Sequence, residues 1–345
     1  MARLNPNSFS YPDSNFAFML MLPHVFARSR TALKRYWPRK QLSTLAKGAL
    51  IVTGVPAGIY IYKCLMMVLF QNKLIYLGYI PPGSRFEEFT SDKVPSGLRV
   101  QEETVWTSDK KQLKGFSVER NDGAEKSQGP VMVYFQGNAG NMIHRFDLFK
   151  TMIQAVPDLT VVGVCYRGFG SSLGRATEKG LQRDASAILK HVCDRYDQDR
   201  PIYLYGHSLG GAVALSLLSS PSPMEDKKKR VRGVILENTY TGIEQMVKAL
   251  YPRYTPYPFI AKYFLWNRWP SMEKIAQVTC PMLFLSSCKD EIVPPSHMQQ
   301  LYDAAKKAAF KELIQFPKAT HMDMYQVESA SFKSAIKQFI SSSSM

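Results

Sequence analysis

Of all stretches in this chain, residues 202–218, IYLYGHSLGGAVALSLL, limit the possible folds most strongly. Residues 202–205 form an apolar run typical of a buried strand, and residues 212–218 are good helix formers. The G-x-S-x-G spacing between them, centred on Ser208, predicts a tight strand-to-helix turn. Its flanking positions need glycine because a Cβ would clash with the neighbouring strand and helix. Such a turn exposes the serine hydroxyl above a helix N-terminus, so Ser208 is a candidate nucleophile.

Apolar runs and helical patterns alternate along most of the chain. The apolar runs are at residues 131–135, 161–166, 202–205, 234–236, 282–285 and 313–316, and residues 102–106 and 112–118 predict a hairpin. The helical patterns are at residues 142–155, 178–196 with Thr177 as N-cap, 209–219, 296–308 and 322–340. Continuous apolar runs suit strands that are buried on both faces. Strands alternating with helices predict an α/β fold with a mostly parallel, doubly wound sheet.

One segment, residues 238–278, departs from this alternation. It contains four prolines, and the tyrosines and tryptophans Tyr251, Tyr254, Tyr257, Tyr263, Trp266 and Trp269. The segment connects two predicted strands whose carboxyl ends flank the serine, which is where ligands bind in open α/β sheets. We therefore interpret it as a small lid-like insertion, with a long packed connection as the alternative.

The front of the chain predicts a membrane anchor. Residues 48–70 carry a single charge, Lys63, and a helix of this length would extend about 34 Å, enough to cross a bilayer. Residues 1–47 contain eight lysines or arginines and one acid. We expect a basic N-terminal segment (1–47), a transmembrane helix (48–70), a linker (71–97) and a catalytic domain (98–340). A buried helix of a soluble protein is the alternative to the anchor.

The basic segment also bears on location. Positive charge before a single span predicts a cytosolic N-terminus and a catalytic domain on the opposite side of the membrane. This favours a single-pass protein of the endoplasmic reticulum or another endomembrane. The first 47 residues are also arginine-rich and poor in acids, as mitochondrial presequences are, so the mitochondrial inner membrane is the alternative.

Two later strands each end in a candidate partner for Ser208. Asp290 follows the apolar run at 282–285, and His321 follows the run at 313–316. A carboxylate in the first loop can orient a histidine, which takes the proton of the serine. The chain order of serine, acid and histidine is the one this topology requires. Glu291 and Glu237 compete with Asp290 for the role of the acid.

An acyl-transfer serine also needs backbone amides that stabilise an oxyanion. The residue after the nucleophile, Leu209, supplies one N–H group. The second is expected from the glycine-containing loop after the run at 131–135, and we assign it to Asn138. His207, inside the turn, is expected to point away from the pocket.

Composition excludes several classes of protein. A hydrophobic content of 45% argues against disorder. The net charge is +16, yet the chain shows no aromatic-interleaved basic motif, so we expect no nucleic-acid partner. The five cysteines lack metal-ligand spacing. We expect no metal and no cofactor.

Taken together, the motifs GHSLGG, VYFQGNAGN, CYRGFGSS, SSCKDEIVP and ATHMD resemble those of the α/β-hydrolase fold. More narrowly, the chain resembles the membrane-anchored α/β-hydrolase-domain proteins related to the fungal bud-emergence hydrolases, over about residues 72–340. The resemblance implies Ser208, Asp290 and His321 as a catalytic triad and the Asn138 and Leu209 amides as the oxyanion hole. Gln136 departs from the family, in which many members have a histidine before the glycine.

These residues predict a membrane-anchored serine hydrolase that cleaves an acyl ester or thioester through an acyl-enzyme. A tether in the lipid bilayer favours substrates of the lipid or acylated-protein type. An amidase or peptidase using the same triad is one alternative. A non-catalytic membrane-tethered scaffold is another.

Overall fold

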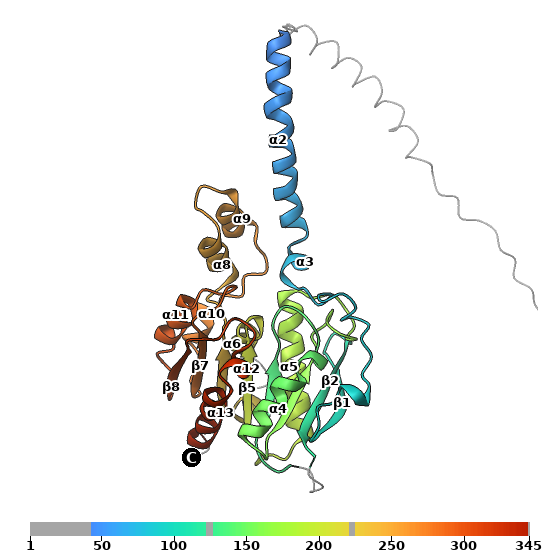
Figure 1. Cartoon of the computed structure of the whole chain (residues 1–345), viewed down its shortest axis with the longest axis vertical. Coiled ribbons are helices and arrows are strands. Elements are labelled where there is room, and N and C mark those ends of the chain that lie inside the picture. Colours follow the sequence, from blue (N-terminus) through green and yellow to red (C-terminus); the bar gives the residue numbers. More distant parts are fainter. Residues whose placement is uncertain (1–42, 122–126, 221–224, 344–345) are drawn as a thin grey trace, which may run out of the picture. The chain divides into compact units, whose positions relative to one another are not determined.

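A single mixed sheet organises the chain. The computed structural model describes residues 43–121, 127–220 and 225–343, and the chain divides into two compact units between Tyr62 and Lys63. Within these described residues, eight strands of the second unit form one sheet in the order β1-β2-β4-β3-β5-β6-β7-β8 (Figure 1). The strands are β1 (Leu98–Trp106), β2 (Gln112–Arg120), β3 (Val131–Phe135), β4 (Thr160–Val164), β5 (Ile202–His207), β6 (Val231–Glu237), β7 (Met282–Ser287) and β8 (Lys311–Phe316).

The pairing of the strands confirms the predicted α/β architecture. β1 pairs antiparallel with β2, as the predicted hairpin requires, and β2 pairs antiparallel with β4. The remaining neighbours, from β4 through β8, pair parallel. All carboxyl ends of these parallel strands therefore lie along one edge of the sheet, where ligands bind in open α/β folds.

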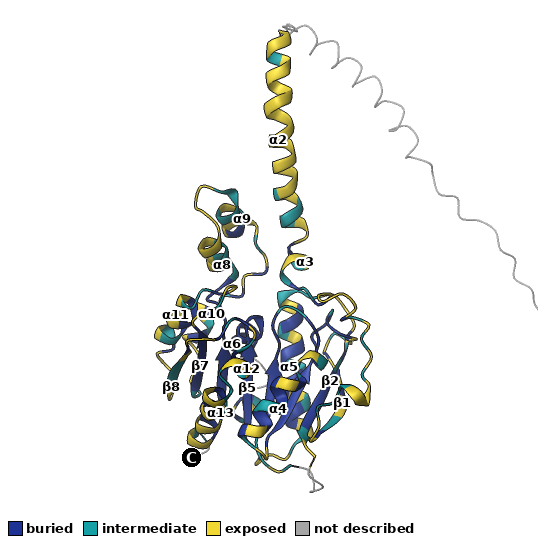
Figure 2. Ribbon diagram, viewed as in Figure 1, coloured by how far each residue is buried: buried dark blue, intermediate teal, exposed yellow. Residues whose placement is uncertain are grey.

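Burial explains why the apolar runs form the central strands. Every residue of β3, β4, β5 and β7 is buried, so the core lies along the middle of the sheet (Figure 2). β6 begins at Val231, three residues before the predicted start. The prediction missed this start because Arg232, which is exposed in the strand, interrupts the apolar run. β4 ends at Val164, two residues before the predicted end.

Helices cover both faces of the sheet. α4 (Phe146–Ala155) packs with α13 (Ser329–Ser343), which in turn contacts α12 (Met324–Val327). On the other face, α6 (Leu209–Ser219) packs between α5 (Glu178–Arg195) and α10 (Ser271–Ile275), and α10 contacts α11 (Ser296–Ala304). The predicted N-cap of α5 is confirmed, because the Thr177 hydroxyl accepts a hydrogen bond of 3.0 Å from the Gly180 amide.

Two helices project from the carboxyl edge between β6 and α10. They are α8 (Ile243–Leu250) and α9 (Pro256–Phe264), and they lie in the segment that the sequence marked as a lid-like insertion (Figure 1). A short helix, α7 (Glu225–Lys228), precedes β6. We refer to residues 243–268, which include α8, α9 and the chain that follows them, as the lid.

The segment expected as a linker packs against the loop that follows β3. It contains α3 (Gln71–Ile75) and the short 3-10 helix η1 (Ser91–Lys93). Leu77 forms a bridge with Ala139, and the Gly140 amide donates a hydrogen bond of 2.7 Å to the Ile80 carbonyl. This part of the chain therefore supports the loop in which Asn138 lies.

The long helix at the front is α2 (Thr44–Leu69). Within the described residues, it is the one helix that is long and apolar enough to cross a membrane. It begins four residues before the predicted span and ends one residue before the predicted end, and none of its residues is buried (Figure 2). The rest of the predicted basic segment, residues 1–42, lies outside the described residues.

Candidate active site

Ser208 occupies a strained turn between β5 and α6. Its φ is 53° and its ψ is −117°, a backbone conformation that side-chain-bearing residues rarely adopt. The Ser208 amide donates to the Glu237 carbonyl at 2.8 Å, and the Ser208 carbonyl accepts from the Thr239 hydroxyl at 2.6 Å. These bonds to β6 and to the loop that follows it hold the turn in place.

Glycine is required on both sides of this serine. A Cβ on Gly210 would lie 1.9 Å from the Phe135 carbonyl oxygen, and a Cβ on Gly206 would lie 2.5 Å from the Gly210 carbonyl oxygen. Both obstacles are backbone atoms, which cannot rotate away as a side chain can. The helix can approach β3 and β5 this closely only without these side chains.

We expect Gly210→Ala to lower the free energy of unfolding by about 3 kcal/mol or more, because the added methyl group forces α6 away from β3. The thermal midpoint of the purified full-length protein in detergent measures the effect. Gly83→Ala is a control in which the Cβ meets open space at a φ of +90°, so it costs about 1 kcal/mol of backbone strain alone. Equal midpoints for the two variants would contradict the steric argument.

The loops after β7 and β8 bring Asp290 and His321 together. The Nδ1 atom of His321 lies 2.7 Å from Oδ2 of Asp290, and both side chains are buried. The other carboxylate oxygen of Asp290 accepts hydrogen bonds from the amides of Ile292 and Val293, at 2.9 and 2.7 Å. The carboxylate is therefore fixed from its own loop and accepts the Nδ1–H proton of the imidazole, an arrangement that leaves Nε2 of His321 without a proton.

The two competing acids have other partners. Glu291 accepts a hydrogen bond of 3.1 Å from the backbone amide of His321, not from its ring. Glu237 is buried beneath the site and accepts a hydrogen bond of 2.7 Å from the Tyr205 hydroxyl. Of the three acids, Asp290 is the one bonded to the His321 ring.

Residues next to Ser208 hold the loop that carries His321. The side-chain amide of Asn238 donates to the His321 carbonyl at 3.1 Å, and Nε2 of His207 lies 3.0 Å from the same oxygen. The His207 and His321 rings are 4.9 Å apart. The His207 ring therefore packs against the loop of His321, where the His321 carbonyl offers its N–H a partner. Ser208 and His321 are thus connected through their immediate neighbours.

His207 acts here as a neutral group. Burial, and then the nearby His321, hold the pKa of His207 well below its usual value. A carbonyl partner at Nε2 places the proton on that nitrogen, and Nδ1 has no hydrogen-bond partner within the part of the chain that the structure describes. The contacts of His207 and Asn238 with the His321 carbonyl were not predicted from the sequence. A polar residue directly after an apolar strand, as Asn238 is after β6, was the available signal.

The loop expected to supply the second oxyanion donor lies beside Ser208. A Cβ on Gly137 would be 3.6 Å from the Ser208 Cβ and 3.1 Å from Nδ1 of His207. Gln136, the departure from the family pattern, is buried and donates through Nε2 to the Gly140 carbonyl at 3.3 Å, which closes the loop on itself. Leu77 fixes Asn138 by donating its amide to the Asn138 carbonyl at 2.7 Å. Leu209, the first residue of α6, directly follows the serine.

The carboxyl group of Glu237 is expected to make the stability of the protein depend on pH. Burial raises its pKa to about 7, although the Tyr205 hydroxyl and then His321 act in the opposite direction. The folded protein therefore holds a proton that the unfolded chain releases above its ordinary pKa near 4.5. The free energy of unfolding should therefore be highest at acidic pH, as far as this group is concerned. It should fall by about 2–3 kcal/mol as the pH rises from the unfolded pKa toward 7.

Glu237→Gln should remove this loss, so the variant's thermal midpoint should change less than that of the wild type between pH 5 and pH 7.5. Glu291→Gln replaces a solvent-exposed carboxylate and is the control. Identical pH dependences of the wild type and Glu237→Gln would show that the buried carboxyl does not titrate in this range.

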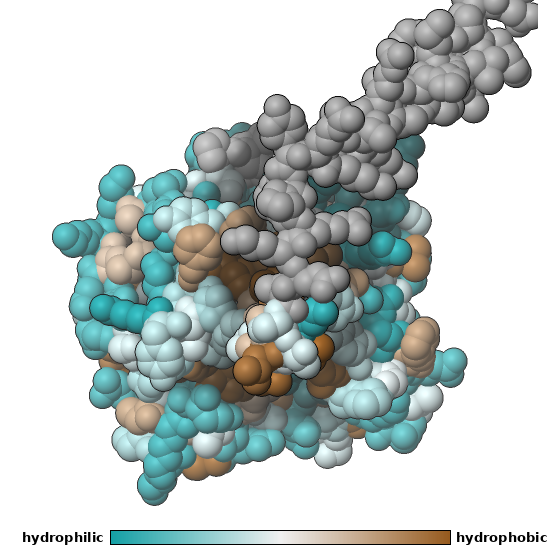
Figure 3. All heavy atoms as spheres, turned by 90° about the horizontal axis from the view of Figure 1, so that it is seen from above, coloured by the Kyte–Doolittle hydropathy of each residue, from teal (hydrophilic) through white to brown (hydrophobic). Residues whose placement is uncertain are grey.

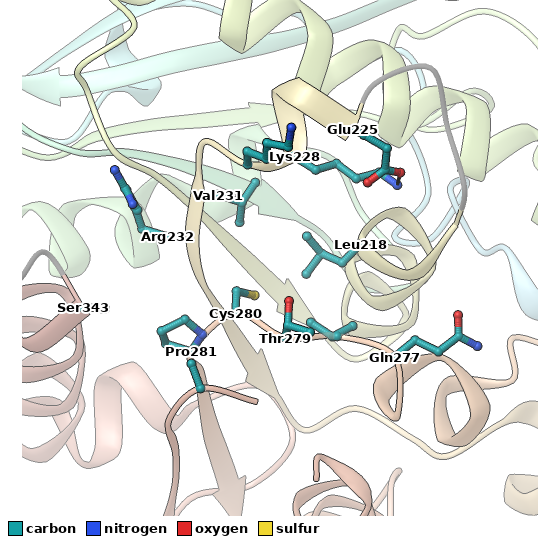
Figure 4. Close-up of a pocket in the computed structure, with 13 residues that line it drawn as sticks. Leu218, Glu225, Lys228, Val231, Arg232, Gln277, Thr279, Cys280, Pro281 and Ser343 are labelled. Carbon is teal, nitrogen blue, oxygen red and sulfur yellow. Dashed lines mark hydrogen bonds and ion pairs between the residues drawn. The ribbon is translucent and has the colours of Figure 1, made fainter. Parts of the chain in front are cut away.

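A pocket lies at the opposite edge of the sheet. It has a volume of about 450 Å³, and Val231 at the start of β6, Cys280 and Pro281 before β7, and Ser343 at the end of α13 contribute to its lining (Figure 4). These residues mark the amino ends of the parallel strands, whereas Ser208, Asp290 and His321 follow the carboxyl ends. The pocket is therefore separate from the candidate active site. Within the part of the chain that the structure describes, no group of three His, Cys, Asp or Glu residues is placed to hold a metal ion.

The amino-acid sequence is similar to proteins of known family. Residues 147–274 match the family described as serine aminopeptidase, S33. The α/β-hydrolase domain-containing protein WAV2 of Arabidopsis thaliana is 33% identical over 290 residues, which cover 81% of this chain and 87% of the relative. Protein bem46 of Schizosaccharomyces pombe is 32% identical over 281 residues, or 80% and 85% of the two chains.

Two further similarities are more distant. The lysophosphatidylserine lipase ABHD12 of Rattus norvegicus is 28% identical over 242 residues, which cover 65% of this chain and 57% of the lipase. The structure of the Pyrococcus furiosus esterase Pf2001 superimposes with a TM-score of 0.57 at 17% identity, over 74% of this chain and 96% of the esterase. The shared fold and the extent of the match to WAV2 and bem46 show that this chain belongs to the α/β-hydrolase family, among its bud-emergence-type hydrolase-domain proteins.

Proposed function

We propose that this α/β hydrolase is a membrane-anchored serine hydrolase that cleaves an acyl ester or thioester, with Ser208 as nucleophile, His321 as base and Asp290 as the acid that orients it. The observation that carries the proposal is the 2.7 Å hydrogen bond between Asp290 and His321 Nδ1, at the same edge of the sheet as the strained Ser208 turn. The α/β-hydrolase relatives include a lipase and an esterase by name, which supports an ester-cleaving activity.

The mechanism follows from the position of each group. Nε2 of His321 removes the proton of the Ser208 hydroxyl as the serine oxygen attacks the acyl carbonyl. Asp290 stabilises the imidazolium that forms and keeps Nδ1 protonated. The backbone amides of Leu209 and Asn138 stabilise the oxyanion, and each such donor is typically worth about 3 kcal/mol of transition-state stabilisation. His321 then protonates the leaving group, and water releases the acid from the acyl-enzyme.

The proposed substrates are lipid-like acyl groups or acylated proteins. α2 is long and apolar enough to anchor the chain in a bilayer, which would hold the enzyme beside substrates of this kind. The membrane of the endoplasmic reticulum or another endomembrane is the proposed location, and the mitochondrial inner membrane is the alternative. The lipase ABHD12 acts on a lysophospholipid according to its name, which agrees with this substrate class.

Labelling and turnover of the full-length protein test the proposal. A fluorophosphonate probe, which reacts with activated serines, should label the wild type and should not label Ser208→Ala. Purified protein should then hydrolyse a matched acyl ester or thioester faster than the corresponding amide. Absence of labelling in a folded wild-type protein would favour the non-catalytic scaffold.

A peptidase or amidase is the second candidate, because residues 147–274 match a family described as serine aminopeptidase. The same set of substrates separates the two activities. Faster cleavage of the amide than of the ester would replace the esterase proposal with this one, although the roles of Ser208, Asp290 and His321 would stay the same.

A further inference from the structure

We propose that the lid docks on the surface of a phospholipid bilayer, with the aromatic residues of α9 inserted among the lipids and the basic residues beside anionic headgroups. The proposal rests on the proposed membrane anchoring by α2 and extends it from the anchor to the hydrolase unit. The proposed binding partner of this surface is therefore the same bilayer in which α2 would be anchored.

The lid concentrates exposed large hydrophobic side chains in one short stretch of the hydrolase unit. Within residues 250–266 the exposed ones are Leu250, Tyr251, Tyr254, Phe259, Tyr263, Phe264 and Trp266. Over the described residues between 81 and 249 there are three, dispersed along the sequence: Phe86, Trp106 and Leu173. Soluble proteins rarely expose a cluster like that of the lid without a partner. Viewed from the side on which α8 and α9 lie, hydrophobic groups are visible among hydrophilic ones (Figure 3).

Three exposed rings of the lid, all on α9, pack on one another. Phe259 lies 4.8 Å from Tyr263 and 6.3 Å from Phe264 between ring centroids, along a single helix. Tyr254 is 90% exposed in the connection between α8 and α9. Tyrosine and tryptophan, which combine an apolar ring with a polar group, are the residues enriched at membrane–water interfaces. A bilayer surface suits this composition.

The positive charge of the lid favours binding to anionic lipids. The lid contains four basic residues, Lys248, Arg253, Lys262 and Arg268, and a single acid, Glu244. Glu244 is paired with Lys248 at 2.6 Å and with Arg268 at 3.8 Å. Arg253 and Lys262 add further positive charge on and beside the aromatic helix. Basic side chains close to a membrane surface attract anionic headgroups, so we expect tighter docking on vesicles that contain phosphatidylserine.

The lid is fastened to the chain where α2 ends. Gln71, which is 5% exposed and follows Leu69 by two residues, donates through Nε2 to the Phe264 carbonyl at 3.1 Å. Its Oε1 accepts the Trp266 amide at 3.0 Å. Two residues of extended chain span about 7 Å at most. The C-terminal end of α9 is therefore held close to the point at which the membrane-spanning helix would leave the bilayer.

A second contact brings the lid alongside the last turns of α2. The ammonium group of Lys63 lies 5.8 Å from the centroid of the Tyr257 ring. Lys63 precedes Leu69 by six residues, or about 9 Å of helix. The charge that interrupts the apolar span thus lies beside the lid, at a depth expected near the headgroups.

The base of the lid is rigid, which fixes its orientation on the hydrolase unit. The Trp269 indole donates to the Tyr76 hydroxyl at 3.0 Å, and that hydroxyl donates to Asn267 at 2.9 Å. Glu178, at the start of α5, accepts the Trp269 amide at 3.2 Å. Docking of the lid would therefore position the carboxyl edge of the sheet, with Ser208, toward the membrane from which an acyl lipid would enter.

Depth-dependent quenching tests the docking directly. Full-length Tyr254→Cys is labelled with bimane, in a background whose partly or fully accessible cysteines at 64, 280 and 288 are replaced by serine, and is reconstituted into phosphatidylcholine vesicles containing phosphatidylserine. A lipid with a nitroxide near its headgroup should quench the label at least about two-fold, because an interfacial helix buries its apolar face about 5–10 Å deep. Phe86→Cys, labelled at an equally exposed position outside the lid, is the control and should remain unquenched.

A label at Val55→Cys, within α2, read with a lipid whose nitroxide lies in the acyl chain, separates this proposal from the anchoring on which it rests. If position 55 is quenched and position 254 is not, the anchor stands and the docking is overturned. If position 254 is quenched and position 55 is not, the lid binds lipid but the anchoring proposal has failed. The double variant Arg253→Glu and Lys262→Glu should reduce quenching at position 254 only in vesicles with phosphatidylserine. Equal quenching of the parent protein in vesicles with and without that lipid would overturn the role of the basic residues.

Discussion

Ser208→Ala is expected to lower kcat for an acyl ester by about 10⁶-fold and to abolish fluorophosphonate labelling, because the variant has no oxygen that can form the acyl-enzyme. The effect should reach kcat and kcat/KM alike, since substrate binding does not require the hydroxyl. Single-turnover assays of the protein reconstituted in vesicles, together with gel-based labelling, provide the measurement.

Ser216→Ala is the matched control for this variant. Ser216 is buried on the same helix, and its hydroxyl has no hydrogen-bond partner among the described residues, so its removal should leave both labelling and turnover intact. Ser208→Ala protein that keeps one-hundredth or more of the wild-type rate would contradict the assignment of Ser208 as nucleophile.

Asp290→Asn is expected to lower kcat by about 10⁴-fold with little change in the fold. An asparagine amide can still accept the amides of Ile292 and Val293 through its oxygen. Its NH₂ group would then face Nδ1 of His321, which forces the proton onto Nε2 and removes the base. Steady-state rates across a pH series, with circular dichroism to verify folding, measure the loss.

Glu237→Gln distinguishes the two buried carboxyl groups near His321. Glu237 is bonded to Tyr205 and not to the histidine ring, so its amide variant should change kcat by less than about ten-fold. A greater loss of activity for Glu237→Gln than for Asp290→Asn would reverse the assignment of the acid.

Much of the fold could be predicted because its signals are local. Apolar runs that are buried on both faces, such as β3 and β5, show in the sequence as continuous stretches without polar interruption. Some boundaries were misplaced where polar residues enter an element. Arg232 hid the start of β6, and the predicted helix at 296–308 ends at Ala304 instead.

The site was predictable in its residue types but not in its supports. Asp290 and His321 could be placed at the carboxyl edge because each follows an apolar strand, and the structure brings their side chains into hydrogen-bond contact. The bonds from His207 and Asn238 to the His321 carbonyl join residues 114 and 83 positions apart. No local pattern encodes such contacts, so they could not be predicted from the sequence.

The sequence by itself determined the turn at Ser208, the succession of strands and helices, and the apolar helix at the front, because each depends on residues within one or two turns of chain. Only the tertiary structure decided which acid contacts His321, which groups hold the histidine loop, and that Gln71 fastens the lid to the end of α2. These decisions depend on the order and register of the strands, which bring distant loops to one edge of the sheet. Close packing then leaves each buried polar group only the partners that lie within hydrogen-bond distance.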